Sequence, residues 1–187
     1  MSALTAPLLG ARRPVTSARL NRLRAGVLGA NDGIVSVAAI VVGVAGASAG
    51  VAAVATAGVA GLVAGALSMA SGEYVSVSSQ RDAERAGTGT RADDDELTNP
   101  WHAAWASLGA FVAGGVVPLL VAIAPWARAA LVPAVVVAVV LALVVTGAVS
   151  ARIGGAPTGR AVVRNVVGGS VAMAVTFAVG SMVGLAV

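Results

Sequence analysis

The chain contains 187 residues, of which 58% are hydrophobic and only 11% are charged, and its mean hydropathy is +0.92. Soluble domains contain about 45–50% apolar and about 25% charged residues, so this composition excludes an ordinary soluble enzyme, a disordered chain and a nucleic-acid-binding module. The net charge of +4 comes from arginines and acids, and cysteine is absent, which excludes disulfides and thiolate metal sites.

The first segment, residues 1–24, carries five arginines. Residues 16–24 have the pattern of a short basic amphipathic helix, which we expect on the cytoplasmic surface of a membrane. The alternative is that these arginines serve only as an orientation signal. In both cases residues 1–24 form a basic cytoplasmic segment that precedes a membrane domain over residues 25–187.

Five apolar runs follow, each near the length of about 20 residues that a helix needs to cross a bilayer. Helices in lipid satisfy their own backbone hydrogen bonds, so we expect helices in spite of the abundant valine. The predicted fold class is therefore an all-α membrane protein with five transmembrane helices. The predicted helices cover residues 25–47, 52–79, 101–124, 131–151 and 161–187, with a short acidic cytoplasmic loop at 80–100.

The placement of arginine predicts the orientation of the chain. Five arginines precede the first span, three follow the second, and three flank the link between the fourth and fifth. Only Arg128 lies on the other side. Positive residues remain preferentially in the cytoplasm, so the N-terminus is predicted to be cytoplasmic and the C-terminus to lie outside.

Two acids, Asp32 and Glu73, lie inside apolar runs, whereas the other six lie between the second and third predicted helices. A carboxylate inside the membrane is costly and usually faces a cavity or a partner. Each of the two lies eight residues from an arginine at the cytoplasmic helix end, Arg24 or Arg81, which is about 12 Å of helix. We therefore expect them at matched depth on adjacent antiparallel helices, converging on one site.

Met69 precedes Glu73 by four residues and therefore lies on the same face of the helix. A thioether beside carboxylates is a soft ligand suited to a divalent transition metal. Because carboxylates bind metal when deprotonated, metal binding there can be exchanged for protons. Three alternatives remain open: Met69 as a packing residue, Glu73 extending toward the membrane surface, and Asp32 as a helix break or cap beside Gly33.

Other polar residues indicate less specific roles. His102, beside Trp101, is expected at the membrane interface, and the acidic run 93–96 is either a solvated loop or a weak attractant for cations. The sequence contains one histidine and no Walker, GxSxG or HExxH motif. It therefore predicts no enzymatic site and no tightly bound cofactor.

Two long motifs carry a family resemblance. Residues 23–36 read LRAGVLGANDGIVS, and residues 58–80 read GVAGLVAGALSMASGEYVSVSSQ. Together with RDAE at 81–84 and ELTNPW at 96–101, they resemble the vacuolar iron transporter family. The resemblance extends over nearly all of the chain from about residue 19 onward.

The resemblance implies a five-helix membrane fold that works as a homodimer and moves Fe(II), often also Mn(II), out of the cytoplasm in exchange for protons. Family members have an aspartate in the Asp-Gly step of the first helix, which matches Asp32, and a methionine in the second helix, which matches Met69. Both line the pathway near the dimer axis. Glu73 matches the GEY motif of bacterial relatives, so these three residues are the expected metal contacts.

The chain also departs from the family pattern. Some members carry a further acid in the second helix, where this chain has Gly61. Many members have a long Glu-rich cytoplasmic helical domain after the second helix, whereas this chain has about twenty residues there. Glu84 matches the beginning of that domain and is the fourth expected metal ligand. A short bacterial form is expected, with weaker metal capture, different selectivity or ligands from another source.

The leading hypothesis is thus a homodimeric exporter of Fe(II) or Mn(II), with H⁺ as the coupling ion. The lipid bilayer is its environment, and the cell membrane of a bacterium is the expected location, since arginine without lysine indicates a GC-rich genome. Two other classes remain open. One is a non-transporting membrane module for assembly or regulation, and the other is an exporter of organic cations, against which the 3% aromatic content argues.

Overall fold

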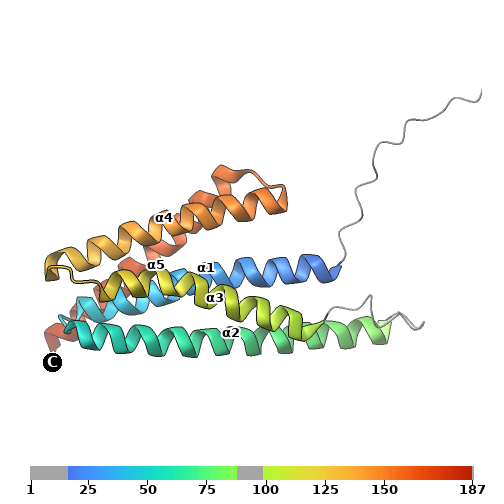
Figure 1. The fold of residues 1–187 in the computed structure, drawn as a ribbon, viewed down its shortest axis with the longest axis horizontal. Coiled ribbons are helices and arrows are strands. Elements are labelled where there is room, and N and C mark those ends of the chain that lie inside the picture. Colours follow the sequence, from blue (N-terminus) through green and yellow to red (C-terminus); the bar gives the residue numbers. More distant parts are fainter. Residues whose placement is uncertain (1–16, 88–98, 187) are drawn as a thin grey trace, which may run out of the picture.

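The computed structural model describes residues 17–87 and 99–186. Over these residues the protein is all helical, without a strand, and each helix is long and apolar enough to cross a membrane (Figure 1). This confirms the predicted fold class. The helices are α1 (Ser17–Gly46), α2 (Val51–Gly87), α3 (Pro100–Ile123), α4 (Arg128–Gly154) and α5 (Thr158–Ala186).

Two helices extend further than the hydropathy pattern indicated. α1 begins at Ser17 and continues without a break through Ala25, so the short basic helix predicted at 16–24 and the first span belong to one helix. α2 continues eight residues beyond Ser79 to Gly87, because the polar sequence that follows contains good helix formers such as Gln80 and Glu84. A hydropathy pattern ends where the apolar sequence ends, whereas the helix itself continues into the polar sequence.

The start of α3 agrees with its sequence signal. Asn99 is the N-cap, and its side-chain oxygen accepts hydrogen bonds from the backbone nitrogens of Trp101 at 3.0 Å and His102 at 3.4 Å. Pro100 occupies the first turn, where its missing N–H costs nothing. The predictions for the acidic run 93–96, and for Arg12, Arg13 and Arg91, lie outside the described residues.

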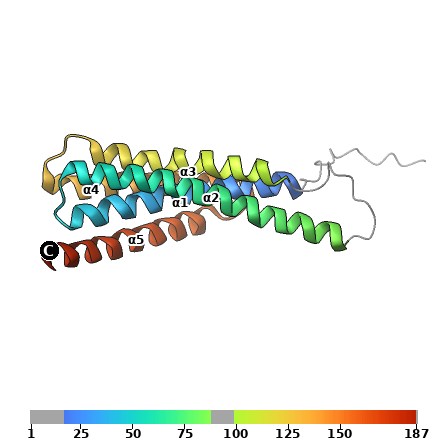
Figure 2. The same ribbon diagram turned by 90° about the horizontal axis from the view of Figure 1, so that it is seen from below.

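The central helix is α1, which contacts each of the other four, whereas α2 contacts only α1 and α3 within the described ranges (Figure 2). The main buried cluster runs along α1, where Val37 and Val41 meet Phe111 of α3 and Leu143 of α4. α2 and α5 leave most of their apolar length exposed. Those exposed faces therefore meet lipid or another chain.

Glycines bring α1 into direct backbone contact with two neighbours. A Cβ atom on Gly33 of α1 would collide with the carbonyl oxygen of Phe111 in α3. Further along α1, the carbonyl oxygen of Gly43 occupies the space that a Cβ atom on Gly180 of α5 would need. The first half of α1 is thus joined closely to α3 and the second half to α5.

Gly33→Ala is expected to lower the free energy of unfolding by about 1–3 kcal/mol, because the added methyl group must push α1 and α3 apart. Thermal unfolding in detergent measures the change. Gly109→Ala is the matched control, since nothing lies within 4 Å of a Cβ atom at Gly109. Equal melting temperatures for the two variants would contradict the close contact.

One end of the bundle is rich in arginine. The starts of α1, α3 and α5 and the ends of α2 and α4 lie together at this end, which we call the arginine end (Figure 1). Arg128 alone among the described arginines lies at the opposite end, at the start of α4. The arginine end carries Arg22, Arg24, Arg81, Arg85, Arg152, Arg160 and Arg164.

Candidate functional site

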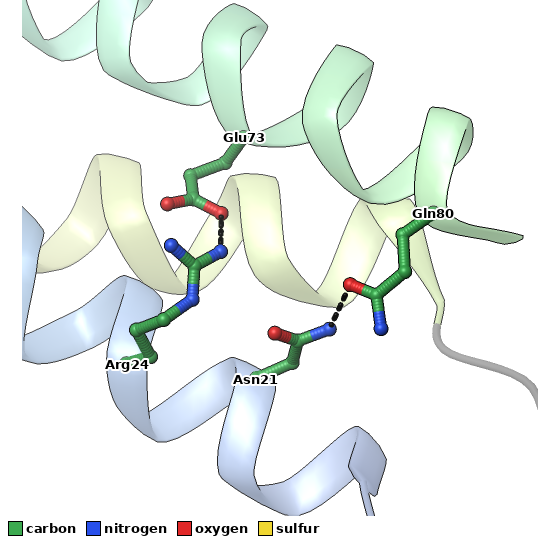
Figure 3. Close-up of polar contacts among 4 residues, drawn as sticks. All are labelled: Asn21, Arg24, Glu73 and Gln80. Carbon is green, nitrogen blue, oxygen red and sulfur yellow. Dashed lines mark hydrogen bonds and ion pairs between the residues drawn. The ribbon is translucent and has the colours of Figure 1, made fainter.

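Glu73 is the most buried carboxylate of the described chain, with 5% of its side chain exposed. Its Oε2 atom accepts a hydrogen bond from the guanidinium of Arg24 on α1, and the two form an ion pair at 3.0 Å (Figure 3). The Arg24 side chain is 52% exposed, so the pair joins a buried anion to a cation that still reaches water. A buried carboxylate requires such a partner.

A chain of polar side chains continues from this pair toward the arginine end. Asn21 Nδ2 donates to Gln80 Oε1 at 3.0 Å, which links α1 to α2 a second time (Figure 3). Gln80 Nε2 then donates to Glu84 Oε1 at 2.9 Å. Glu84 lies eleven residues beyond Glu73 along α2, about 16 Å by helical rise, so the structure does not bring these two acids together.

Asp32 lies on α1 and is half-buried. Its Oδ1 atom accepts a hydrogen bond of 2.7 Å from the hydroxyl of Ser36, one turn further along the same helix. The α-helix runs through Asp32 and Gly33 without interruption, so Asp32 neither caps nor breaks the helix. A single hydroxyl leaves most of the acceptor capacity of this carboxylate available for another donor or a cation.

Two contacts set the register of α1 against α2. Asn21 meets Gln80 near the arginine end, and the side chain of Ile40 lies against Gly61 nearer the opposite end. Because the two helices are antiparallel, each step forward along α1 between these contacts corresponds to one step backward along α2. This register gives the depth of each candidate ligand relative to the others.

In this register Asp32 lies level with about Met69, and Glu73 lies about one turn, or 5–6 Å, nearer the arginine end. The predicted matched depth of Asp32 and Glu73 is therefore wrong by about one turn. Counting residues from Arg24 and Arg81 does not compare depths, because this register places Arg81 level with residue 20, about one turn nearer the arginine end than Arg24. The two acids still lie within one helical turn of each other in depth.

Met69 is half-buried and packs against the main hydrophobic cluster. Packing and ligation are therefore both compatible with its position. No group of three His, Cys, Asp or Glu side chains able to hold a metal ion occurs in the described part of the chain. One chain thus offers two carboxylates and a thioether at neighbouring levels. These three ligand groups are fewer than the four to eight ligands that divalent ions take in resident sites.

Two features of this region were missed by the sequence analysis. Arg24 was assigned to a basic helix on the membrane surface or to an orientation signal, although the rule that a buried acid needs a partner already suggested a cation near Glu73. Asn31, beside Asp32, has a buried side-chain oxygen without a hydrogen-bond partner in the described residues. No pattern in the sequence pointed to Asn31.

Comparison with known proteins places these residues in a family context. The model of the family described as the VIT family matches residues 23–93 and 85–181. The chain is 48% identical over 111 residues to "Vacuolar iron transporter homolog 5" of Oryza sativa subsp. japonica, a match that covers 57% of this chain and 53% of that protein. It is 47% identical over 135 residues to "Vacuolar iron transporter homolog 1" of the same plant, covering 63% and 58%.

A relative from a second plant gives the same result. "Vacuolar iron transporter homolog 3" of Arabidopsis thaliana is 45% identical over 110 residues, covering 57% of this chain and 55% of that protein. In all three matches the chain spans little more than half the length of the curated relative.

Proposed function

The chain belongs to the VIT family, whose model matches nearly all of its described helices, and on this basis we propose that it moves a divalent metal ion across a membrane. The names of the curated relatives make Fe(II) the first candidate ion, and Mn(II) is the second because it accepts the same oxygen ligands. The observation that carries the proposal is the placement of Asp32 and Glu73 on facing helices, one turn apart in depth.

The proposed path leads from the arginine end inward. Glu84, at the polar end of α2, first attracts the ion, and Glu73 then receives it when the guanidinium of Arg24 moves aside. Asp32 and Met69 receive the ion one turn deeper. Few ligands at each level suit transport, since an ion in transit must leave each position again.

Protons are the proposed counter-ion. A carboxylate must lose its proton before it binds metal, so transfer of the ion onto Asp32 releases a proton and its departure allows one to return. Glu73 is already ionised in its pair with Arg24, so there the ion replaces the guanidinium and not a proton. The positive-inside rule places the arginine end in the cytoplasm, which makes outward movement of metal the proposed direction. The cell membrane of a bacterium is the proposed location.

A homodimer is the proposed assembly. α2 presents an outer face of small and hydroxyl residues, including Ala64, Ser68 and Ser71, all of them exposed. Such faces allow close contact between helices in lipid. We therefore propose that α2 meets α2 of a second copy through this face, while Glu73, on the opposite side of α2, stays paired with Arg24 inside each chain.

Single cysteines introduced by Ala64→Cys, Ser68→Cys and Ser71→Cys test this arrangement, because the native chain contains no cysteine. At least one of them is expected to form a disulfide-linked dimer in membranes after mild oxidation, detected by a non-reducing gel. Val171→Cys, on the exposed face of α5, is the control and is expected to remain monomeric. Cross-linking of Val171→Cys alone would assign the interface to α5 instead.

Transport itself is tested with the protein reconstituted in liposomes that enclose a metal-sensitive dye. Fe(II) or Mn(II) entry is expected to depend on the protein and to increase with an imposed pH gradient, whereas liposomes without protein are expected to show no change in the dye signal. A second candidate function is a membrane module without transport, favoured by the fact that Arg24 already satisfies Glu73. Absence of metal flux with well-folded, correctly inserted protein would support that second function.

A further inference from the structure

A cavity of about 490 Å³ lies between α1, α4 and α5 near the arginine end, on a different set of helices from Met69 and Glu73. Two arginines line it, Arg24 from α1 and Arg164 from α5. Ser150, Asn31 and Asn165 add polar atoms to its walls, and no acid contributes to them. The cavity therefore combines two positive charges with apolar walls that include Leu23, Val27 and Leu28.

The polar groups of this cavity are incompletely satisfied within the described chain. Arg164 has no ion-pair or hydrogen-bond partner there, and the side-chain oxygen of Asn31 is buried and unbonded. A guanidinium is a donor suited to phosphate oxygens. The unpaired guanidinium of Arg164 thus matches a ligand that carries a phosphate.

A second hollow adjoins the first through Arg164, which lines both. This shallow groove of about 600 Å³ runs along the outer face of α5, between Gly159 and Gly168. Val163 and Val167 form its floor and are 61% and 55% exposed. An apolar groove on a membrane-length helix, continuous with a cationic cavity at the helix end, fits a hydrocarbon chain attached to an anionic headgroup.

We propose that this composite site binds an anionic phospholipid from the leaflet at the arginine end, with its phosphate between Arg24 and Arg164 and an acyl chain in the groove on α5. Basic cavities between membrane helices bind such headgroups. The groove makes a lipid the occupant instead of free phosphate, because free phosphate leaves the apolar part of the site empty. Phosphatidylglycerol, whose headgroup carries the negative charge of its phosphate without a compensating cation, is the probe that this chemistry selects.

Arg24 gives the site a connection to the candidate metal path. The same side chain lines the cavity and pairs with Glu73. A phosphate in the cavity attracts the guanidinium and weakens its hold on Glu73. Lipid binding therefore favours the state in which the Glu73 carboxylate is available to another cation.

The test is native mass spectrometry of the full chain in neutral detergent, titrated with phosphatidylglycerol, phosphatidylcholine or inorganic phosphate. Phosphatidylglycerol is expected to bind at least fivefold more tightly than phosphatidylcholine, and Arg164→Gln is expected to remove most of that preference, since one basic residue near an anionic surface contributes about a factor of five. Arg152→Gln is the matched control, because Arg152 lies at the same end of the bundle but lines neither hollow.

Ser150→Glu provides a second variant should Arg164→Gln fail to fold, because it places an acid in the cavity and is also expected to abolish the preference. Circular dichroism checks that each variant is helical. Equal binding of phosphatidylcholine, an unchanged preference in both folded variants, or saturation by inorganic phosphate that excludes the lipid would overturn the proposal. None of these readouts depends on metal transport.

Discussion

Flux of Fe(II) or Mn(II) through Asp32→Asn is expected to fall to about 1% of the flux through the unaltered chain. Asparagine has the size of aspartate but no negative charge and no proton to exchange, so it retains the packing and removes the proposed ligand. Loss of groups that merely orient a metal ligand costs about 10–100-fold, and loss of a ligand itself is expected to reach at least the upper limit. Dye-loaded liposomes measure the rate.

Two further variants make this result specific. Asp82→Asn removes an exposed acid at the polar end of α2 and is expected to retain most of the flux. Ser36→Ala removes the hydrogen bond of 2.7 Å to Asp32 and is expected to have a smaller effect than Asp32→Asn. If Asp32→Asn retains more than half of the flux while its helical content is normal, Asp32 is not a transport ligand.

Arg24→Ala is expected to lower the free energy of unfolding by about 2 kcal/mol, because it leaves the buried Glu73 carboxylate without its counter-ion. This figure is below the 3–5 kcal/mol typical of fully buried pairs because Arg24 is 52% exposed. Glu73→Ala leaves only a half-exposed arginine unpaired and is expected to cost less. The double variant Arg24→Ala/Glu73→Ala is expected to recover part of the stability that Arg24→Ala loses.

Thermal unfolding of the four proteins in one detergent gives the coupling between the two positions as a double-mutant cycle. Arg22→Ala is the matched control, since Arg22 lies one half-turn away on the same helix and has no ion-pair or hydrogen-bond partner on α2 in the described chain. An Arg24→Ala variant as stable as Arg22→Ala would mean that the ion pair at 3.0 Å contributes nothing to the fold.

The number and position of the helices were predictable because lipid imposes a strict length on apolar runs. The N-cap at Asn99 was predictable because the residues that form it lie within four consecutive positions of the sequence. The ends of α1 and α2 were not, because polar residues such as Gln80 and Glu84 continue a helix after the hydropathy signal has ended. Local chemistry therefore identified the spans more reliably than it identified their limits.

The candidate site was predictable only in its composition. A carboxylate in an apolar run is costly and therefore usually functional, and this rule identified Asp32 and Glu73. The partner of Glu73 depends on the register of α1 against α2, and that register is set by packing contacts such as Ile40 against Gly61. A single sequence contains no direct record of such contacts, so Arg24 was predicted as part of a basic surface helix or orientation signal and not as the partner of Glu73.

The close backbone contacts of α1 limit how the bundle can rearrange. Because α1 touches α3 at Gly33 and α5 at Gly180 with no side chain between the backbones, sliding α1 would break two interlocked surfaces at once. The glycines of α2 make a different kind of contact, because Gly61 and Gly65 pack against the side chains of Ile40 and Phe111 and not against backbone. The position of α1 is therefore fixed by backbone contacts, whereas α2, which carries Met69 and Glu73, is held through side chains.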